Sequence, residues 1–112
     1  MTKLIVDDRE DNKFIGLLIK NNIEHEIVRL NSGDYILSDI CIERKTINDF
    51  YESTITGHLK EQIMTMLENQ KDNLFSHIII VIIGEYDDLF WQGVKTNQHI
   101  FYGMIASIVA KY

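Results

Sequence analysis

The stretch GDYILSDICIERKTIND, residues 33–49, decides the fold because it reads as a hairpin that carries charges where a buried strand would not. Residues 35–37 and 40–45 are rich in β-branched and aromatic residues and predict two strands. Ser38 and Asp39 between them predict a two-residue turn. Acidic and basic side chains are rarely buried without partners, so the stretch indicates a site for a cation, a phosphate or both.

The register of this hairpin decides its chemistry. Counting outward from the turn places Asp34 opposite Glu43, with Cβ atoms about 4.5–5.5 Å apart, where like charges repel. A divalent cation removes that repulsion, and such oxygen ligands suit Mg²⁺ or Mn²⁺. Strand alternation places Lys45 on the face of Glu43 and Arg44 on the other. Lys45 can then hold a water or steady charge on a phosphate, and Asp7, after the first predicted strand, can reach the same cluster.

Two alternatives stay open for the hairpin. Ser-Asp is not a favoured two-residue turn, and a bulge or longer loop would make Asp34 and Glu43 diagonal neighbours that one cation still reaches. The simpler interpretation is a salt-bridged edge hairpin in which Arg44 and Lys45 are solvated. The metal site is favoured because three charged residues, Asp34, Glu43 and Lys45, all have the positions that a single metal site in this hairpin requires.

The rest of the chain predicts an α/β fold. The expected elements are strand 3–6, helix 11–22, strand 26–30, strands 35–37 and 40–45, a helical segment 46–73 with a break at Thr56 and Gly57, a strand 77–84 buried on both faces, a loop 87–96 and a helix 97–111. The order β-α-β-β-β-α-β-α predicts a mixed sheet flanked by helices, in a single domain over residues 1–112.

Composition narrows the class of protein. The 112 residues are 46% hydrophobic and 25% charged, as in ordinary globular domains, and lack a bilayer-length apolar run or a signal peptide. Cys41 is the only cysteine, which predicts a reducing, intracellular setting, the cytoplasm of a prokaryote or a nucleus, and a thiol that fills the core. The net charge of −6 counts against general nucleic-acid binding unless metal ions or another domain supply affinity.

Motifs across the chain resemble the XPF/Hef family of structure-specific DNA endonucleases, within the restriction-endonuclease-like, PD-(D/E)XK superfamily. They are VDDRE at 6–10, GDY at 33–35 and ERKTIND at 43–49, followed by Asp49-Phe50 and by GHLKEQ at 57–62, which is similar to the family's GxLxxQ. The motifs occur in the family's order and cover nearly the whole chain. Together they are far more specific than the superfamily pattern alone.

The resemblance implies a role for each matching residue. The metal ligands would be Asp34, Glu43, Asp7 and the carbonyl of Arg44, with Mg²⁺ or Mn²⁺ as cofactor and Lys45 positioning the hydrolytic water. Supporting or DNA-contacting roles are implied for Arg9, Glu10, Asp49, His58 and Gln62. The implied reaction is cleavage of branched, flap or forked DNA in repair or replication-fork processing, often by a homodimer or heterodimer.

The chain also departs from the family pattern. His58 stands where the family usually has Arg, which weakens a phosphate contact or makes it depend on pH. Nothing resembles a helix-hairpin-helix module. The sequence ends at residues 110–112, so the strand and helix that follow in the family are expected to be absent.

Two other functions compete with the nuclease. A catalytically silent scaffold of the same fold would bind DNA or a partner nuclease subunit. A phosphoacceptor receiver domain is suggested by LIVDD at 4–8 and by the length. That class needs an Asp and a Lys at the ends of later strands, whereas Asp39 falls in a turn and Lys95 in a loop.

Overall fold

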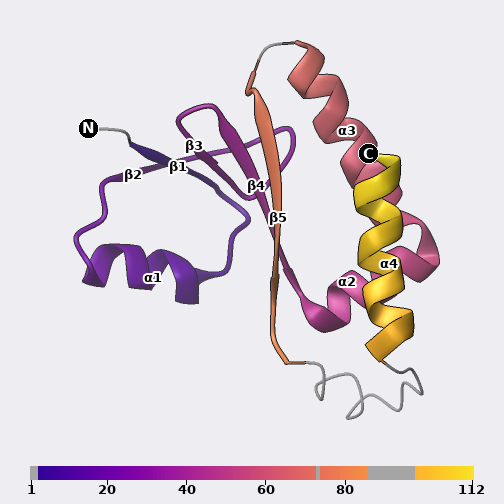
Figure 1. Cartoon of the computed structure of the whole chain (residues 1–112). Coiled ribbons are helices and arrows are strands. Elements are labelled where there is room, and N and C mark those ends of the chain that lie inside the picture. Colours follow the sequence, from indigo (N-terminus) through magenta and orange to yellow (C-terminus); the bar gives the residue numbers. More distant parts are fainter. Residues whose placement is uncertain (1–2, 73, 86–97) are drawn as a thin grey trace. The chain divides into compact units, whose positions relative to one another are not determined.

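The computed structural model describes residues 3–72, 74–85 and 98–112 (Figure 1). In chain order the elements are β1 Leu4–Asp7, α1 Asn12–Lys20, β2 His25–Val28, β3 Tyr35–Leu37, β4 Ile40–Thr46, α2 Ile47–Thr56, α3 His58–Lys71, β5 His77–Ile83 and α4 Gln98–Lys111. The predicted order gains one helix, because the helical segment divides at the expected break into α2 and α3. The predicted loop 87–96 lies outside the described residues.

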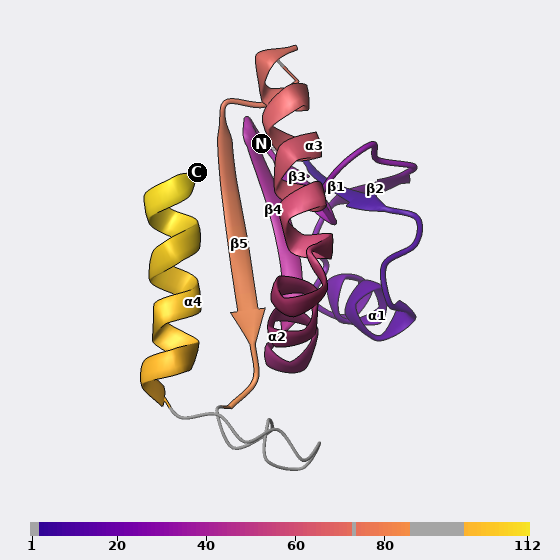
Figure 2. The ribbon, with the colours of Figure 1, turned by 90° about the vertical axis from the view of Figure 1, so that its right-hand side faces the viewer.

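The sheet is mixed and five-stranded, in the order β2-β1-β3-β4-β5. β1 pairs in parallel with β2 and antiparallel with β3, and β3 pairs antiparallel with β4. Figure 2 shows β4 and β5 side by side. The predicted α/β class is therefore confirmed, and the end of β1 lies beside the start of β3, which pairs with the first half of β4.

The predicted turn of the β3–β4 hairpin is confirmed. Leu37 pairs with Ile40, so that Ser38 and Asp39 form the two-residue connection. Ser38 has a positive φ of 56°, a conformation that tight hairpin turns require. The turn fixes which residues of β3 and β4 pair. Successive residues of β4 face opposite sides of the strand, and Cys41 and Glu43 are the buried residues on one of these sides.

The chain divides into two compact units, each with its own buried residues. The first comprises Met1–Arg44 and Met64–Val81, and the second comprises Lys45–Ile63 and Ile82–Tyr112. In the first unit the buried hydrophobic residues are Val6, Cys41, Met66 and Phe75. In the second they are Ile47, Phe50, Leu59 and Ile63.

Local signals explain where the helices begin and end. Asp11 caps α1 by accepting a hydrogen bond of 2.9 Å from the Lys13 amide, and Thr46 caps α2 by accepting one of 3.1 Å from the Asp49 amide. Gly57 ends α2 in the left-handed region, at φ 87°. The strand β4 therefore runs directly into a capped helix.

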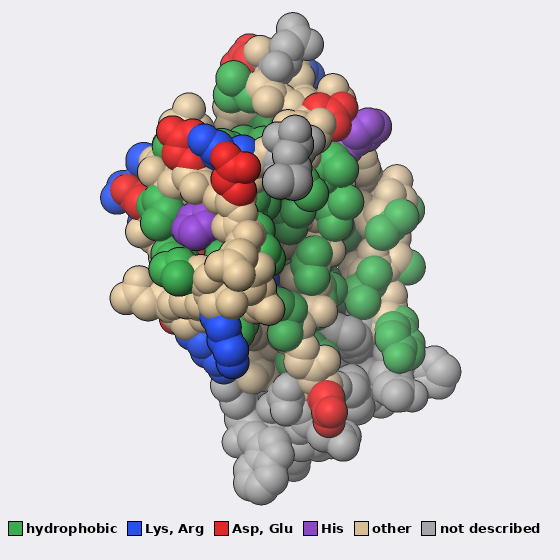
Figure 3. All heavy atoms as spheres, turned by 90° about the vertical axis from the view of Figure 1, so that its left-hand side faces the viewer, with side chains coloured by type: hydrophobic (Ala, Val, Ile, Leu, Met, Phe, Trp, Pro, Cys, Tyr) green, Lys and Arg blue, Asp and Glu red, His purple; other side chains and the backbone are tan. Residues whose placement is uncertain are grey.

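One prediction about the sheet is wrong. β5 is not buried on both faces, since Ile79, Val81 and Ile83 are 40–45% exposed and alternate with less exposed residues. Hydrophobic side chains at the surface are visible in Figure 3. The β-branched run reflects strand preference at the edge of the sheet rather than burial from both sides. Among the described residues, no helix is long and apolar enough to cross a membrane.

Replacing Gly33 with alanine is expected to destabilise the fold by about 1–3 kcal/mol. Gly33 has a φ of 77°, and an added Cβ would overlap the Cys41 sulfur and lie 3.3 Å from the Ile42 carbonyl oxygen. Urea unfolding measures the effect. The matched control is Gly16→Ala in α1, where nothing lies within 4 Å of the new Cβ and a neutral or stabilising effect is expected. Equal unfolding midpoints for Gly33→Ala and the unchanged chain would contradict the packing described.

The Cys41 thiol is expected to be inert in the folded protein. Burial, followed by the charge of Glu43, raises the pKa of Cys41 to about 11, and its side chain is fully buried. At pH 8 the thiol therefore stays protonated and shielded. A chromogenic aromatic disulfide should label it slowly in buffer and stoichiometrically in urea. Rapid labelling of the native chain would show that Cys41 is not in the core.

Candidate active site

Asp34 lies directly before β3 and is held by the strands on both sides. Its amide donates a hydrogen bond of 2.8 Å to the Ile42 carbonyl, and its own carbonyl accepts one of 2.9 Å from the Asp7 amide. Its Oδ2 accepts a hydrogen bond of 2.8 Å from the Arg44 amide. The carboxylate of Asp34 is thus fixed between the end of β1 and the second half of β4.

The surroundings of Asp34 disfavour the ionised form of its carboxyl group. Burial raises the pKa of Asp34, and the nearby charges of Glu10 and Asp7 raise it further, while the Arg44 amide acts in the opposite direction. The net pKa is higher than that of an ordinary aspartate. A positive ion beside this carboxylate would stabilise its ionised form and offset the repulsion from the neighbouring negative charges.

Glu43 is buried in β4, on the same side of the strand as Cys41. Burial raises the pKa of the Cys41 thiol, and the charges of Glu43 and Asp34 raise it further. The expected ladder pair between Asp34 and Glu43 does not form. The ladder ends at Tyr35 and Ile42, and the Asp34 amide bonds to Ile42 because the chain turns away at Gly33.

Arg44 is a half-buried cation with partners inside the first unit. Its Nη2 lies 2.6 Å from Glu10 Oε1 and its Nε 3.3 Å from Glu10 Oε2, while the Phe14 ring centroid lies 4.0 Å from its Cζ. The Glu10 and Arg44 side chains are only 2% and 19% exposed. Burial works to raise the pKa of Glu10, but the hydrogen bonds from Arg44 and Asp11 outweigh it and hold the pKa below its usual value. The interpretation in which Arg44 is merely solvated is therefore wrong.

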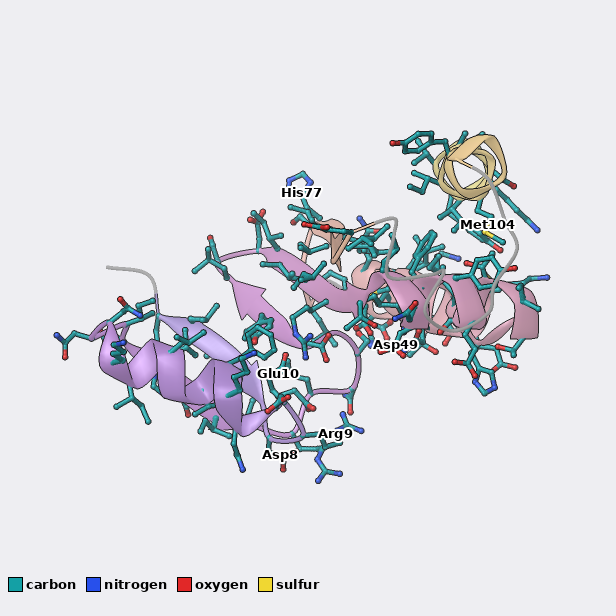
Figure 4. The ribbon with its side chains drawn as sticks, turned by 90° about the horizontal axis from the view of Figure 1, so that it is seen from below. Asp8, Arg9, Glu10, Asp49, His77 and Met104 are labelled. Atoms are coloured by element: carbon teal, nitrogen blue, oxygen red, sulfur yellow. The ribbon has the colours of Figure 1, made fainter. Side chains whose placement is uncertain are left out.

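Asp7, the last residue of β1, forms a second charged pair with Arg9 in the turn that follows. Asp7 Oδ2 accepts hydrogen bonds from the Arg9 amide and Nε, at 3.1 and 2.9 Å, and Oδ1 accepts one from Arg9 Nη2 at 3.0 Å. The hydrogen bonds from Arg9 are the largest influence on Asp7 and hold its pKa below the ordinary value. Figure 4 shows Asp8, Arg9 and Glu10 together in this turn.

The remaining predicted residues belong to the second unit of the chain. Lys45 follows Arg44 in β4, Asp49 is exposed in the first turn of α2, His58 begins α3 and is exposed, and Gln62 lies in α3. Their predicted roles stay predictions. The acidic and basic residues that the first unit brings together are Asp7, Arg9, Glu10, Asp34, Glu43 and Arg44.

Sequence reasoning missed two partners of this cluster. Phe14 lies within the predicted helix 11–22 and was given no role in the site, yet its ring stacks on the Arg44 guanidinium. Leu30 contributes its backbone, which bonds to both Asp7 and Arg9. A backbone partner leaves no trace in residue type, so no signal in the sequence could have identified Leu30.

The donor atoms suit a hard divalent cation, although they do not form a closed cage. Among the described residues, no three His, Cys, Asp or Glu side chains are grouped to hold a metal ion. Mg²⁺ is commonly bound through one or two carboxylates, with water and substrate phosphates filling the other positions. Asp34, Glu43 and a backbone carbonyl match that pattern better than a site of three or more acids.

The sequence matches relatives across most of its length. Residues 6–112 match the ERCC4 domain family. A protein of Methanocaldococcus jannaschii, MJ1505, named as an ATP-dependent RNA helicase, is 40% identical over 98% of this chain and 12% of its own length. The DNA repair endonuclease XPF of Drosophila melanogaster is 42% identical over 57% of this chain and 7% of its own. The chain thus spans about an eighth or less of these relatives.

Solved structures share the fold. XPF from Aeropyrum pernix aligns with a TM-score of 0.74 at 24% identity, covering 98% of this chain and 49% of that one. The structure of XPF from the same organism in complex with DNA aligns with a TM-score of 0.73 at 25% identity, covering 98% and 50%. With the family match over residues 6–112, these similarities establish that the chain belongs to the ERCC4 domain family.

Proposed function

We propose that the chain is a metal-dependent nuclease domain that hydrolyses phosphodiester bonds in branched, flap or forked DNA. The observation that carries this proposal is the Asp34 carboxylate, raised in pKa and fixed by the Arg44 amide near the buried Glu43. These residues occupy the GD and ERK motifs of a chain in the ERCC4 domain family. Relatives named DNA repair endonucleases, and an XPF structure in complex with DNA, support the substrate class.

Asp34, Glu43 and the carbonyl of Arg44 would hold the cation, either Mg²⁺ or Mn²⁺. When bound, such an ion supplies a Lewis acid that polarises the phosphate and lowers the pKa of a water. The chain's own residues orient the reaction: the Arg44 amide fixes Asp34, and the Glu10–Arg44 pair fixes β4 behind Glu43. Lys45, which follows in β4, would donate a hydrogen bond to the attacking water or to a phosphate oxygen.

The charge of the chain sets how it would meet DNA. With a net charge of −6, the chain would bind DNA weakly unless divalent ions offset its carboxylates. Supporting or DNA-contacting roles are proposed for Asp49, His58 and Gln62, and a homodimer or heterodimer would supply further contacts. The setting would be a prokaryotic cytoplasm or a nucleus, in repair or fork processing. The receiver-domain alternative is set aside because the chain belongs to a different family.

Two observations favour a second candidate, a catalytically silent scaffold of the same fold. The described residues contain no group of three potential metal ligands, and both oxygens of Asp7 already accept hydrogen bonds. A scaffold would bind DNA or a partner nuclease subunit through the same surface without needing a cation. The two candidates differ in their response to Mn²⁺ and to the loss of Glu43.

The experiment compares cleavage of labelled flap, fork and linear duplex DNA by the unchanged chain, Glu43→Gln and Asp34→Asn. Each variant is expected to lose at least about 100-fold in rate with Mg²⁺ or Mn²⁺, because one of two charged ligands is gone. The control is Glu26→Gln in β2, whose side chain is 55% exposed, and which should cleave normally.

Three results would decide between the candidates. Cleavage of branched DNA that a chelator abolishes, and that both site variants lose, is the outcome that the nuclease proposal requires. Undiminished cleavage by Glu43→Gln would remove the proposed site. Binding of forked DNA without cleavage, unchanged by Mn²⁺, would establish the scaffold instead.

A further inference from the structure

The turn that carries Asp34 is an irregular segment, and its conformation decides where the carboxylate lies. Residues 29–34 connect β2 to β3 without helix or strand structure. Such a segment has no ladder of its own and must be held by other groups. Its middle is held by Ser32, whose hydroxyl accepts a hydrogen bond of 2.7 Å from Asn69 Nδ2.

Asp7 and Arg9 hold the beginning of this turn through hydrogen bonds to the backbone amide and carbonyl of Leu30. The Leu30 amide donates a hydrogen bond of 2.9 Å to Asp7 Oδ1. Arg9 Nη2 donates one of 2.8 Å to the Leu30 carbonyl. The two side chains are bonded to each other as well, so they close a ring of hydrogen bonds around a single residue of the turn.

Asp7 also holds the end of the same turn. Its amide donates a hydrogen bond of 2.9 Å to the Asp34 carbonyl. One residue at the end of β1 thus contacts both Leu30, near the start of the segment, and Asp34, its last residue. A shift of Asp7 would move the Asp34 backbone relative to β4.

The carboxylate of Asp7 is fully used by these bonds. Oδ1 accepts from the Leu30 amide and Arg9 Nη2, and Oδ2 accepts from the Arg9 amide and Nε. Two oxygens offer about four acceptor positions, so a cation would have to displace existing donors. The Asp7 side chain is 4% exposed, which makes such an exchange costly.

We propose that Asp7 and Arg9 are positioning residues that clamp the Leu30 backbone and so set the place of Asp34, rather than a metal ligand and a phosphate contact. This inference rests on the proposed nuclease function for its effect on rate. The clamp itself can be measured without metal or DNA. Arg9 is suited to the role because its planar guanidinium bonds to a carboxylate and a carbonyl at once.

The experiment compares the full chain with Asp7→Asn, Arg9→Gln and the double variant. Hydrogen exchange of the Leu30 amide, followed by NMR without metal, should become at least about tenfold faster in each, because the clamp opens. Arg9→Gln is the decisive variant, since its side chain is 56% exposed and its loss should leave the fold intact. The control is Arg29→Gln, which breaks the exposed Arg29–Asp8 pair beside the same turn and should leave Leu30 exchange unchanged.

Rates and Mn²⁺ affinity add a second measurement. The cleavage rate should fall about 10–100-fold in each single variant, as for residues that orient ligands. The double variant should cleave no more slowly than the slower of the two single variants, because both substitutions open the same clamp. Mn²⁺ affinity, measured by electron paramagnetic resonance, should fall by similar factors for Asp7→Asn and Arg9→Gln. KM for DNA should stay unchanged in both, because neither residue contacts the substrate.

Three results would overturn the clamp. Mn²⁺ binding abolished by Asp7→Asn but normal in Arg9→Gln would make Asp7 a ligand. A raised KM for DNA in Arg9→Gln with unchanged Leu30 exchange would make Arg9 a phosphate contact. Unchanged Leu30 exchange in both variants would remove the clamp whatever the activity. If the unchanged chain neither binds Mn²⁺ nor cleaves, the proposed function fails, while the exchange data still decide whether the clamp exists.

Discussion

The hydrogen bond from the Arg44 amide to the Asp34 carboxylate is the interaction on which the site depends, because both the backbone and the side chain of Arg44 are held by other groups. Its backbone holds Asp34, and its guanidinium is buried against Glu10 and the Phe14 ring. Removing one member of such a buried pair leaves an uncompensated charge and costs about 3–5 kcal/mol. β4 therefore cannot slide past α1 or β3 without a large penalty, and Glu43 is held in one register.

The parts of the fold that local chemistry controls could be predicted. Ser38 and Asp39, between two predicted strands, identified the hairpin turn, and Gly57 identified the break between α2 and α3. Ser38 and Gly57 both have a positive φ, which is typical of turns and helix ends. The alternation of β4 placed Cys41 and Glu43 on one side of the strand. The motifs identified the residues of the candidate site, because the pattern of residue types is itself the signal.

The parts that depend on distant contacts could not be predicted. The partner of Arg44 lies 34 residues away, and the partner of Asp7 is a backbone amide 23 residues away. The departure of Asp34 from the ladder follows from the conformation of Gly33 and from the bond to the Asp7 amide. The exposure of β5 depends on its place at the edge of the sheet, which the order of strands along the chain does not reveal.

The two charged pairs divide the work of building one acidic site. Glu10 and Arg44 fix β4, and Asp7 and Arg9 fix the turn before β3, so Asp34 is held from both sides. The most direct test of the central claim, that Asp34 and Glu43 jointly bind a divalent ion, is anomalous diffraction from a crystal of the chain soaked in Mn²⁺. One strong peak bonded to both carboxylates and to the Arg44 carbonyl is expected. A peak bonded to neither carboxylate, or to Asp7 in place of Glu43, would contradict it.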